Sequence, residues 1–132
     1  MVDAIGKQIV ERLSYKVIGC AFEVHSELGP GMLESVYEEA LVIELKSQGF
    51  DVKRQQQVPV YYKGQKLSTD LRYDLLVNDE LLIELKSVEA ILPVHCKQLL
   101  TYLKVLKLRD GLLINFNVEK LTQGIKKIAN GY

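Results

Sequence analysis

The sequence predicts an α/β fold, with a small mixed β-sheet flanked by helices, in a single domain spanning residues 1–132. Two short apolar segments, 71–77 and 81–87, are separated by polar turn residues, which is typical of an antiparallel hairpin. Farther along, helical spacing over residues 93–108 precedes an apolar run at 111–116, an arrangement that permits a parallel crossover. We therefore expect antiparallel and parallel strand pairs in one sheet.

Two helices are predicted to precede the sheet. The first has apolar residues at three- and four-residue spacing and ends at Gly29-Pro30-Gly31; these residues are Ile5, Ile9, Leu13, Val17, Ala21, Val24 and Leu28. The second runs from about residue 33 to 48 and closes at Gly49, a residue suited to a helix C-cap. Its inner stripe is predicted to comprise Leu33, Val36, Tyr37, Ala40, Leu41 and Leu45.

The remaining segments complete the expected order of elements. Residues 50–60 are predicted to form a first strand that ends at Pro59 or lies at a sheet edge. Residues 61–67 are expected to turn at Lys63-Gly64 and to enter the strand at 71–77. The tail, 118–132, fits either a helix or an edge strand.

The charge balance limits the modes of nucleic-acid binding. The chain has 17 basic and 17 acidic residues, so its net charge is zero. Non-specific DNA binders of high affinity gain most of that affinity from phosphate neutralisation, which argues against this class. A protein of this net charge that binds nucleic acid would instead need a local positive surface, and the best candidates are Lys97, Lys104, Lys107 and Arg109.

Composition also predicts where the protein works. No apolar run approaches the ~20 residues of a membrane span, and the N-terminal residues lack the layout of a signal peptide. Cys20 and Cys96 lack metal-ligand spacing and are expected to be reduced thiols. These features predict a cytoplasmic protein.

Charged residues interrupt the apolar hairpin. Side chains alternate along a strand, so Glu84 and Lys86 are expected on one face and Ile83 on the other. Burying such charges is costly unless they are paired or bind a metal. A three-residue turn at 78–80 would place Asp74 opposite Glu84, whereas a two-residue turn would place Asp74 opposite Ile83.

At these positions the chain resembles known nucleases. Asp74 and Glu84-Leu85-Lys86 resemble the motif of the PD-(D/E)XK nuclease superfamily, and Gly31-Met32-Leu33-Glu34-Ser35-Val36-Tyr37 resembles the name-giving motif of its GxxExxY family. Gln98-x-x-x-Tyr102 is similar to the Q-x-x-x-Y motif of one nuclease branch. The resemblance covers about residues 10–130 and implies a restriction-endonuclease-like core.

The resemblance also implies metal-dependent hydrolysis of phosphodiester bonds. Asp74 and Glu84 would be side-chain ligands and the Leu85 carbonyl a third ligand. Glu34 would be an outer ligand or a partner of the ligands, and the alternative that it only stabilises the helix N-terminus stays open. Carboxylate and carbonyl oxygens suit Mg²⁺ or Mn²⁺. Lys86 would orient the attacking water or stabilise the transition state.

Other residues have weaker assignments. Gln98 and Tyr102, one turn apart on an exposed helix face, would position the substrate, which is expected to be nucleic acid and DNA in preference to RNA. His25, Tyr37 and Arg72 are candidates for supporting the site, with Arg72 as a charge partner of Asp74. Purely structural roles remain open, as does a homodimer.

One alternative to an enzyme remains at this point. The charges of the hairpin could form an ion-pair network without catalysis. The protein would then be a catalytically silent nuclease-fold module that binds nucleic acid or a protein partner.

Overall fold

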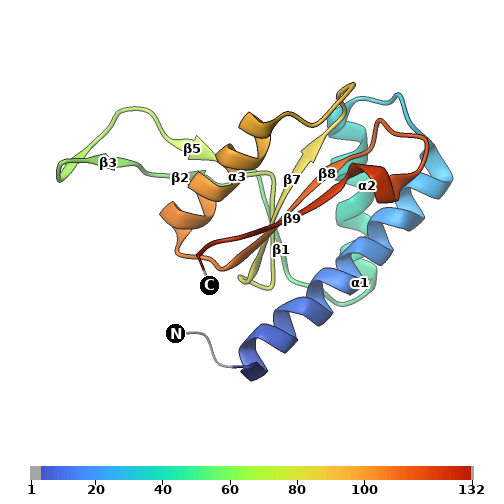
Figure 1. Cartoon of the computed structure of the whole chain (residues 1–132), viewed down its shortest axis with the longest axis horizontal. Coiled ribbons are helices and arrows are strands. Elements are labelled where there is room, and N and C mark those ends of the chain that lie inside the picture. The colour runs from blue at the N-terminus through green and yellow to red at the C-terminus, as the bar shows by residue number, and fades with distance from the viewer. Residues whose placement is uncertain (1–3, 132) are drawn as a thin grey trace.

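A five-stranded mixed sheet forms the centre of the protein (Figure 1). The computed structural model describes the backbone of residues 4–131 and the side chains of residues 12–131. The strands occur in the order β1 (Val52–Arg54), β6 (Leu75–Val77), β7 (Leu81–Lys86), β8 (Asp110–Asn115) and β9 (Ile125–Ala129). Strands β7 and β8 are parallel and the other neighbours are antiparallel, which confirms the predicted mixed sheet.

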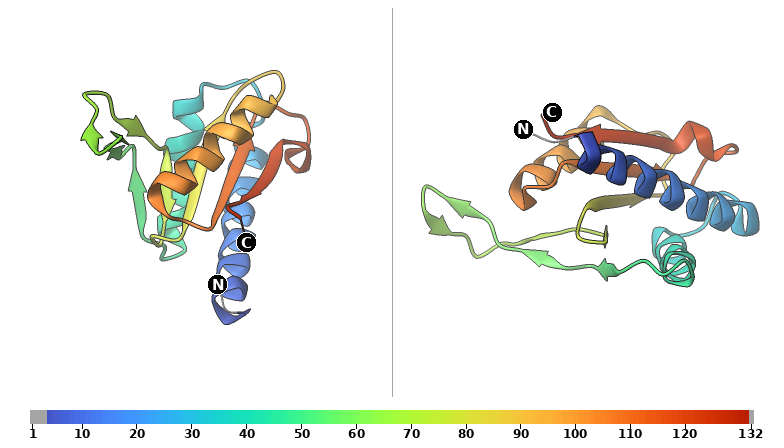
Figure 2. Two further views of the ribbon diagram at one scale, coloured as in Figure 1. Left: turned by 60° about the vertical axis from the view of Figure 1, so that its left-hand side comes forward. Right: turned by 90° about the horizontal axis from the view of Figure 1, so that it is seen from below.

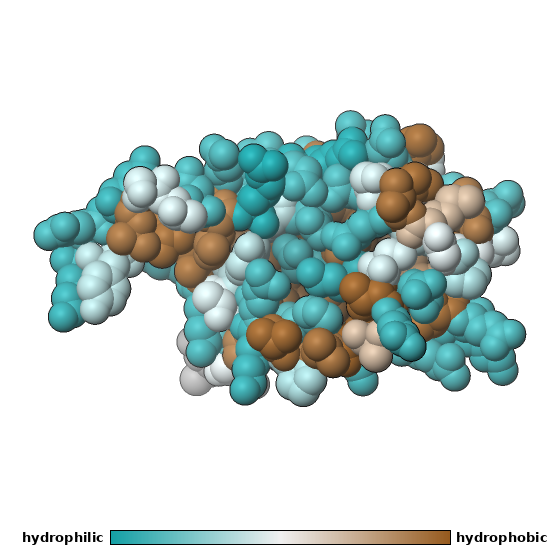
Figure 3. Space-filling view, turned by 90° about the horizontal axis from the view of Figure 1, so that it is seen from above, coloured by the Kyte–Doolittle hydropathy of each residue, from teal (hydrophilic) through white to brown (hydrophobic). Residues whose placement is uncertain are grey.

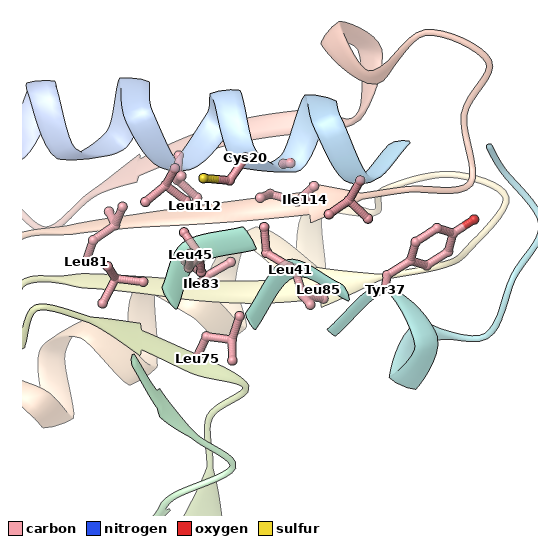
Figure 4. Close-up of a cluster of buried hydrophobic side chains, with 14 of the residues drawn as sticks. Cys20, Tyr37, Leu41, Leu45, Leu75, Leu81, Ile83, Leu85, Leu112 and Ile114 are labelled. Carbon is pink, nitrogen blue, oxygen red and sulfur yellow. The ribbon is translucent and has the colours of Figure 1, made fainter. Parts of the chain in front are cut away.

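Helices cover both faces of this sheet (Figure 2). Helices α1 (Ala4–Leu28) and α2 (Glu34–Ser47) pack on one face, and α3 (Pro93–Leu106) packs on the other. Figure 4 shows the larger apolar cluster, in which side chains of β7 and β8 meet those of α1 and α2. No helix within residues 4–131 is both long and apolar enough to cross a membrane.

The helix predictions are close to the structure. Gly49 has a φ of +84° and follows the end of α2, as expected of a residue that closes a helix. Leu33 was placed in the inner stripe of this helix, and that prediction is wrong, because Leu33 precedes α2 and is 74% exposed. The side chains of Ile5 and Ile9 lie outside the described part of the chain.

The two long strands predicted at 50–60 and 71–77 are each interrupted. Gln55 adopts a left-handed conformation with φ +50°, and the backbone bends at Asp74. Consequently β1 pairs with β6, whereas β2 (Gln57–Val58) pairs with β5 (Leu71–Arg72) outside the main sheet. The interruptions therefore direct the chain away from the sheet just where Asp74 lies.

Residues 59–70 form an arm that projects from the body of the molecule (Figures 1 and 2). It contains the short strands β3 (Tyr61–Tyr62) and β4 (Gln65–Lys66), which pair antiparallel. Lys63 and Gly64 have φ of +48° and +78°, the left-handed pair that a tight hairpin turn requires, and the predicted turn is confirmed.

The tail forms the edge strand that was one of its two expected structures. A short 3₁₀ helix, η1 (Leu121–Gly124), leads into β9, which pairs antiparallel with β8. A side chain at Gly124 would place its Cβ 2.1 Å from the Asn115 carbonyl oxygen, so this close approach requires glycine.

Candidate active site

The connection between β6 and β7 sets the site. Val77 pairs with Leu81 and Leu75 pairs with Ile83, so three residues form the turn, as predicted. Asn78 and Asp79 have φ of +53° and +54°, the left-handed conformation that this turn uses. The same register places Asp74 opposite Glu84, one step beyond the last backbone pair.

The carboxylates of Asp74 and Glu84 each accept a backbone N–H from the segment that carries the other residue. The Asp74 N–H donates to Glu84 Oε1 at 3.3 Å, and the Leu85 N–H donates to Asp74 Oδ2 at 2.8 Å. A carboxylate thus takes the place of a backbone carbonyl at the end of the β6–β7 ladder. Burial, then the charge of Asp74, raise the pKa of Glu84 to about 8, so the carboxyl pair retains a proton at neutral pH.

This donor set fits a divalent cation. Two adjacent carboxylates repel each other, and here a retained proton reduces that repulsion. A bound cation would do the same in place of the proton. The N–H and C=O of one strand residue point towards the same neighbouring strand, so the Leu85 carbonyl is directed to the side of Asp74. The Lys86 carbonyl points the other way and accepts the Phe116 N–H at 3.0 Å. Asp74, Glu84 and Leu85 therefore supply oxygen atoms of the hard type that Mg²⁺ prefers.

A third acidic ligand is not in place. Among the described residues, no three side chains of His, Cys, Asp or Glu are grouped so as to hold a metal ion. Glu34, the additional ligand implied by the motif resemblance, lies near Asp74 without completing such a group.

Lys86 lies on the same face as Glu84, between two acids. Its positive charge opposes the rise in the pKa of Glu84 and also that of Glu34. Among the side chains that the structure describes, Lys86 forms no ion pair with Glu84. The half-buried ammonium is therefore close to the carboxyls without being locked onto one of them.

Tyr37, the last residue of the helix motif, closes the loop before α2. Its phenol donates to the Gly29 carbonyl at 2.5 Å and accepts the Met32 N–H at 3.1 Å. Its ring stacks on Phe116 with centroids 4.5 Å apart. The Ser87 hydroxyl then donates to the Met32 carbonyl at 2.6 Å, which ties this loop to the end of β7. Tyr37 therefore acts by positioning the loop.

Glu34 begins α2 immediately after this loop. Partial burial of the carboxyl and then the charge of Asp74 raise the pKa of Glu34. Glu34 is exposed as a residue, and its carboxyl lies close enough to Asp74 to feel that charge. Glu34 lines an open pocket together with Leu33, Ser35, Glu38 and Gln55.

Two of the supporting candidates form no hydrogen bond or ion pair with the carboxyl pair among the described residues. His25 Nε2 lies 2.7 Å from the Val118 carbonyl oxygen, and the His25 ring lies 6.5 Å from that of Phe116, within the α1 and α2 side of the sheet. The Arg72 side chain is exposed and, within the described part of the chain, forms no ion pair with Asp74. His25 therefore packs and forms a hydrogen bond on the α1 and α2 side of the sheet. The expected ion pair between Arg72 and Asp74 is not formed among the described residues.

The Gln98 and Tyr102 pair is only half as expected. Gln98 is exposed, but Tyr102 is 9% exposed and belongs to the apolar cluster beneath α3, so the expected exposed face is wrong for Tyr102. Its phenol lies near the Arg72 backbone and the Gln98 side chain. Burial and then the charge of Glu84 raise the pKa of Tyr102, so its hydroxyl faces the carboxyl pair.

Sequence reasoning missed a polar network that holds Asp74 from the other side. Gln55 Nε2 donates to Asp74 Oδ1 at 3.2 Å and to Glu38 Oε1 at 2.6 Å. Arg54 Nε donates to the second oxygen of Glu38 at 2.6 Å. Glu38 is 5% exposed. The available signal was that Glu38 shares a helix face with Leu41 and Leu45, because an acid on a buried stripe requires a partner.

Asn115 was also missed. It ends β8, is 1% exposed, and its amide bonds both the N–H and the carbonyl of Val88, at 3.1 and 2.9 Å. This fixes the chain just after Lys86. A buried asparagine at the end of an apolar strand was the signal in the sequence.

A comparison with protein families agrees with this arrangement. The model of the PD-(D/E)XK nuclease superfamily matches residues 11–128. Neither the curated proteins nor the solved structures gave a match. Because the matched segment covers most of the 132 residues, the chain belongs to the PD-(D/E)XK nuclease superfamily.

Proposed function

We propose that the protein is a metal-dependent nuclease of the GxxExxY family that hydrolyses phosphodiester bonds in nucleic acid. The observation that supports this most is the opposed pair of Asp74 and Glu84. Two adjacent carboxyls whose mutual repulsion raises the pKa of Glu84 support a cation site, and Lys86, which forms no ion pair among the described side chains, lies beside them.

Each residue has a role in this proposal. Asp74, Glu84 and the Leu85 carbonyl hold Mg²⁺ or Mn²⁺, which when bound polarises the phosphate and lowers the pKa of a water molecule. The Lys86 ammonium orients the attacking water or stabilises negative charge that develops on the phosphate. The exposed Gln98 amide, held beside the Tyr102 hydroxyl, contacts the substrate backbone.

A local positive surface supports a nucleic-acid substrate. Lys97, Lys104 and Lys107 are exposed on or beside α3. Arg109, the fourth predicted member of this surface, is instead half-buried and its Nε donates to Asp110 at 3.1 Å. We assign phosphate contacts to the three lysines, with DNA preferred over RNA as the substrate.

A specific observation favours the alternative of a silent binding module. Both carboxylate oxygens of Asp74 already accept hydrogen bonds, from the Leu85 N–H and from Gln55. Metal binding would have to compete with the Gln55 contact, the longer of the two. The test must therefore separate metal binding from catalysis.

The test combines thermal unfolding with cleavage assays. We expect Mg²⁺ or Mn²⁺ to raise the Tm of the wild type, because a ligand stabilises the state that binds it. Asp74→Asn and Glu84→Gln should abolish this shift and cleavage of single- and double-stranded DNA or RNA. Without metal, both variants should be neutral or mildly stabilising: the carboxyl pair holds a proton at neutral pH, and above pH 8 each variant removes one of the two charges that repel each other.

Exposed acids of the same types provide matched controls. Asp51→Asn and Glu89→Gln should retain both the metal shift and the cleavage. Cleavage that persists in Asp74→Asn would indicate a contaminant or another site. A wild type with neither a metal shift nor cleavage would contradict the nuclease proposal and favour the module.

A further inference from the structure

The arm, residues 59–70, contributes almost nothing to the apolar core. Every residue in it is exposed except the half-buried Val60, and Tyr61 and Tyr62 are 63% and 62% exposed. Only the base is packed, where Val58 and Leu71 join the cluster beneath α3. Figure 3 shows the end of the arm, at the left, as a hydrophilic projection. Folding thus accounts for the base of the arm and leaves its end unexplained.

The two faces of this ribbon carry the same chemistry. Tyr61 is paired with Lys66, and directly opposed residues share a face. Tyr62 lies on the other face, since successive side chains alternate. The Lys63 ammonium is 5.5 Å from the centroid of the Tyr62 ring. Each face therefore presents one exposed tyrosine and one lysine.

The charge of the arm suits a partner with negative surfaces on two sides. The end of the arm carries Lys63 and Lys66, and the one acidic residue of the arm, Asp70, adjoins its base at Leu71. The major groove of B-form DNA is lined on both sides by phosphates and is wide enough for a two-stranded ribbon. The major groove of A-form RNA is too narrow for one.

The stem of the arm is attached directly to the candidate site. The Gln55 N–H donates to the Asp74 carbonyl at 2.8 Å, and the Tyr73 N–H donates to the Gln56 carbonyl at 3.2 Å. The chain thus leaves for the arm and returns from it beside the carboxylate of Asp74. A duplex held by the arm would run past that carboxylate.

We propose that the arm enters the major groove of duplex DNA, with Lys63 and Lys66 contacting the phosphates of opposite groove walls. Tyr61 and Tyr62 lie against the groove between these contacts. The inference rests on the proposed function, because it gives the same site its substrate class. It makes the arm the main determinant of duplex affinity.

Binding without cleavage tests the arm by itself. Fluorescence anisotropy in EDTA would compare a labelled duplex DNA with its single strand and with an RNA duplex of the same sequence. For Lys63→Gln with Lys66→Gln, we expect duplex DNA affinity to fall about tenfold or more. The slope of log K against log salt should fall by about 2, roughly one for each lost phosphate contact. Tyr61→Ser with Tyr62→Ser should weaken duplex binding with little change in that slope.

A tyrosine–lysine pair on α1 provides the matched control. Tyr15 is 79% exposed and is followed by the exposed Lys16, on the side of the sheet opposite α3. Tyr15→Ser with Lys16→Gln should leave duplex affinity and salt slope unchanged. Circular dichroism would confirm that all variants fold. If the Tm of the double lysine variant fell, the single variant Lys66→Gln would be used in its place.

The outcomes separate the arm from the nuclease. Arm variants that bind duplex DNA as the wild type does, or that lose single strands and RNA equally, would overturn this inference. A wild type that binds duplex DNA through the arm but shows neither a metal shift nor cleavage would overturn only the nuclease. A wild type that cleaves while its arm variants retain full duplex affinity would overturn only the arm.

Discussion

The two faces of β7 have different compositions. Leu81, Ile83 and Leu85 point to the side of α1 and α2, and each has no exposed surface. On the other face, Leu82 is buried beneath α3, whereas Glu84 and Lys86 are half-buried. One strand therefore carries an unbroken apolar row and, on the reverse side, an apolar residue followed by two charges.

This difference teaches how a small domain can bear charges in its central strand. Burial of the apolar row stabilises the folded state. This gain offsets the cost of half-burying the two charged residues on the reverse side. The apolar cluster beneath α3 is kept compact because Gly111 has no side chain, and a Cβ there would lie 3.2 Å from Leu99. The charges begin where that cluster ends.

The largest expected effect is on catalysis, from the charged face. Lys86→Met should lower nuclease activity by roughly 10²–10³, because one preorganised charge is lost at the phosphate. Its metal-induced Tm shift should survive, since Lys86 is not a ligand. Lys46→Met, an exposed change on α2, is the control and should keep full activity. Activity equal to that of the wild type in Lys86→Met would remove this residue from the mechanism.

The apolar face should respond in stability. Ile83→Ala should lower the free energy of unfolding by about 2–5 kcal/mol, through lost burial and the cavity it leaves. Urea denaturation would measure this loss. Ile43→Ala is the matched control, because Ile43 is 69% exposed and its loss should stay within ~0.5 kcal/mol. A loss below ~1 kcal/mol for Ile83→Ala would contradict the conclusion that this apolar face of β7 provides the stability of the fold.

The charged face should also make the metal-free protein sensitive to pH. The pKa of Glu84 is about 8 in the folded protein, above its ordinary value of 4.5, so the folded state binds more protons between these values. The contribution of Glu84 to stability is therefore fully present below about pH 4.5 and is lost as the pH rises through 8, with a fall on the order of 3 kcal/mol between pH 5 and 8. Urea denaturation in EDTA at several pH values checks this. Glu84→Gln should flatten the profile, whereas Glu89→Gln should not, and a wild type that gains stability from pH 5 to 8 would refute it.

Local signals in the sequence were sufficient for much of the fold. The turn residues Asn78 and Asp79 and the apolar phase of the hairpin set its register, and that register places Asp74 opposite Glu84. The parallel crossover through α3 followed from a helix between two apolar strands. These features depend on residues near one another in the sequence.

Features that depend on distant partners could not be predicted. Gln55 has a left-handed backbone, and its side chain is held by Glu38 of α2 and by Asp74. This bend divides a strand that the sequence pattern predicts to be continuous. Tyr102 is buried because the base of the arm, at Val58 and Leu71, packs beside it. The tail became a strand because β8 has a free edge that β9 can pair with.

A smaller effect is expected where the helix motif meets the apolar face. Tyr37→Phe would leave the Gly29 carbonyl and the Met32 N–H without their phenol partner, at a cost of about 1–2 kcal/mol. Thermal or urea unfolding would measure it, with Tyr15→Phe as an exposed control that should change nothing. A neutral Tyr37→Phe would show that the stacked ring alone holds the loop.

The smallest effect on stability should separate the two members of the α3 pair. Gln98 is exposed, so Gln98→Ala should stay within ~0.5 kcal/mol of the wild type while weakening cleavage. Tyr102 is buried and its phenol lies beside polar groups of the Arg72 backbone and Gln98, so Tyr102→Phe, which removes the hydroxyl, should cost about 1 kcal/mol. Gln123→Ala, an exposed change on η1, is the control for Gln98→Ala and should leave cleavage intact. If Gln98→Ala has no effect on cleavage, Gln98 does not contact the substrate. Gln98 and Tyr102 would then serve only to join α3 to the base of the arm.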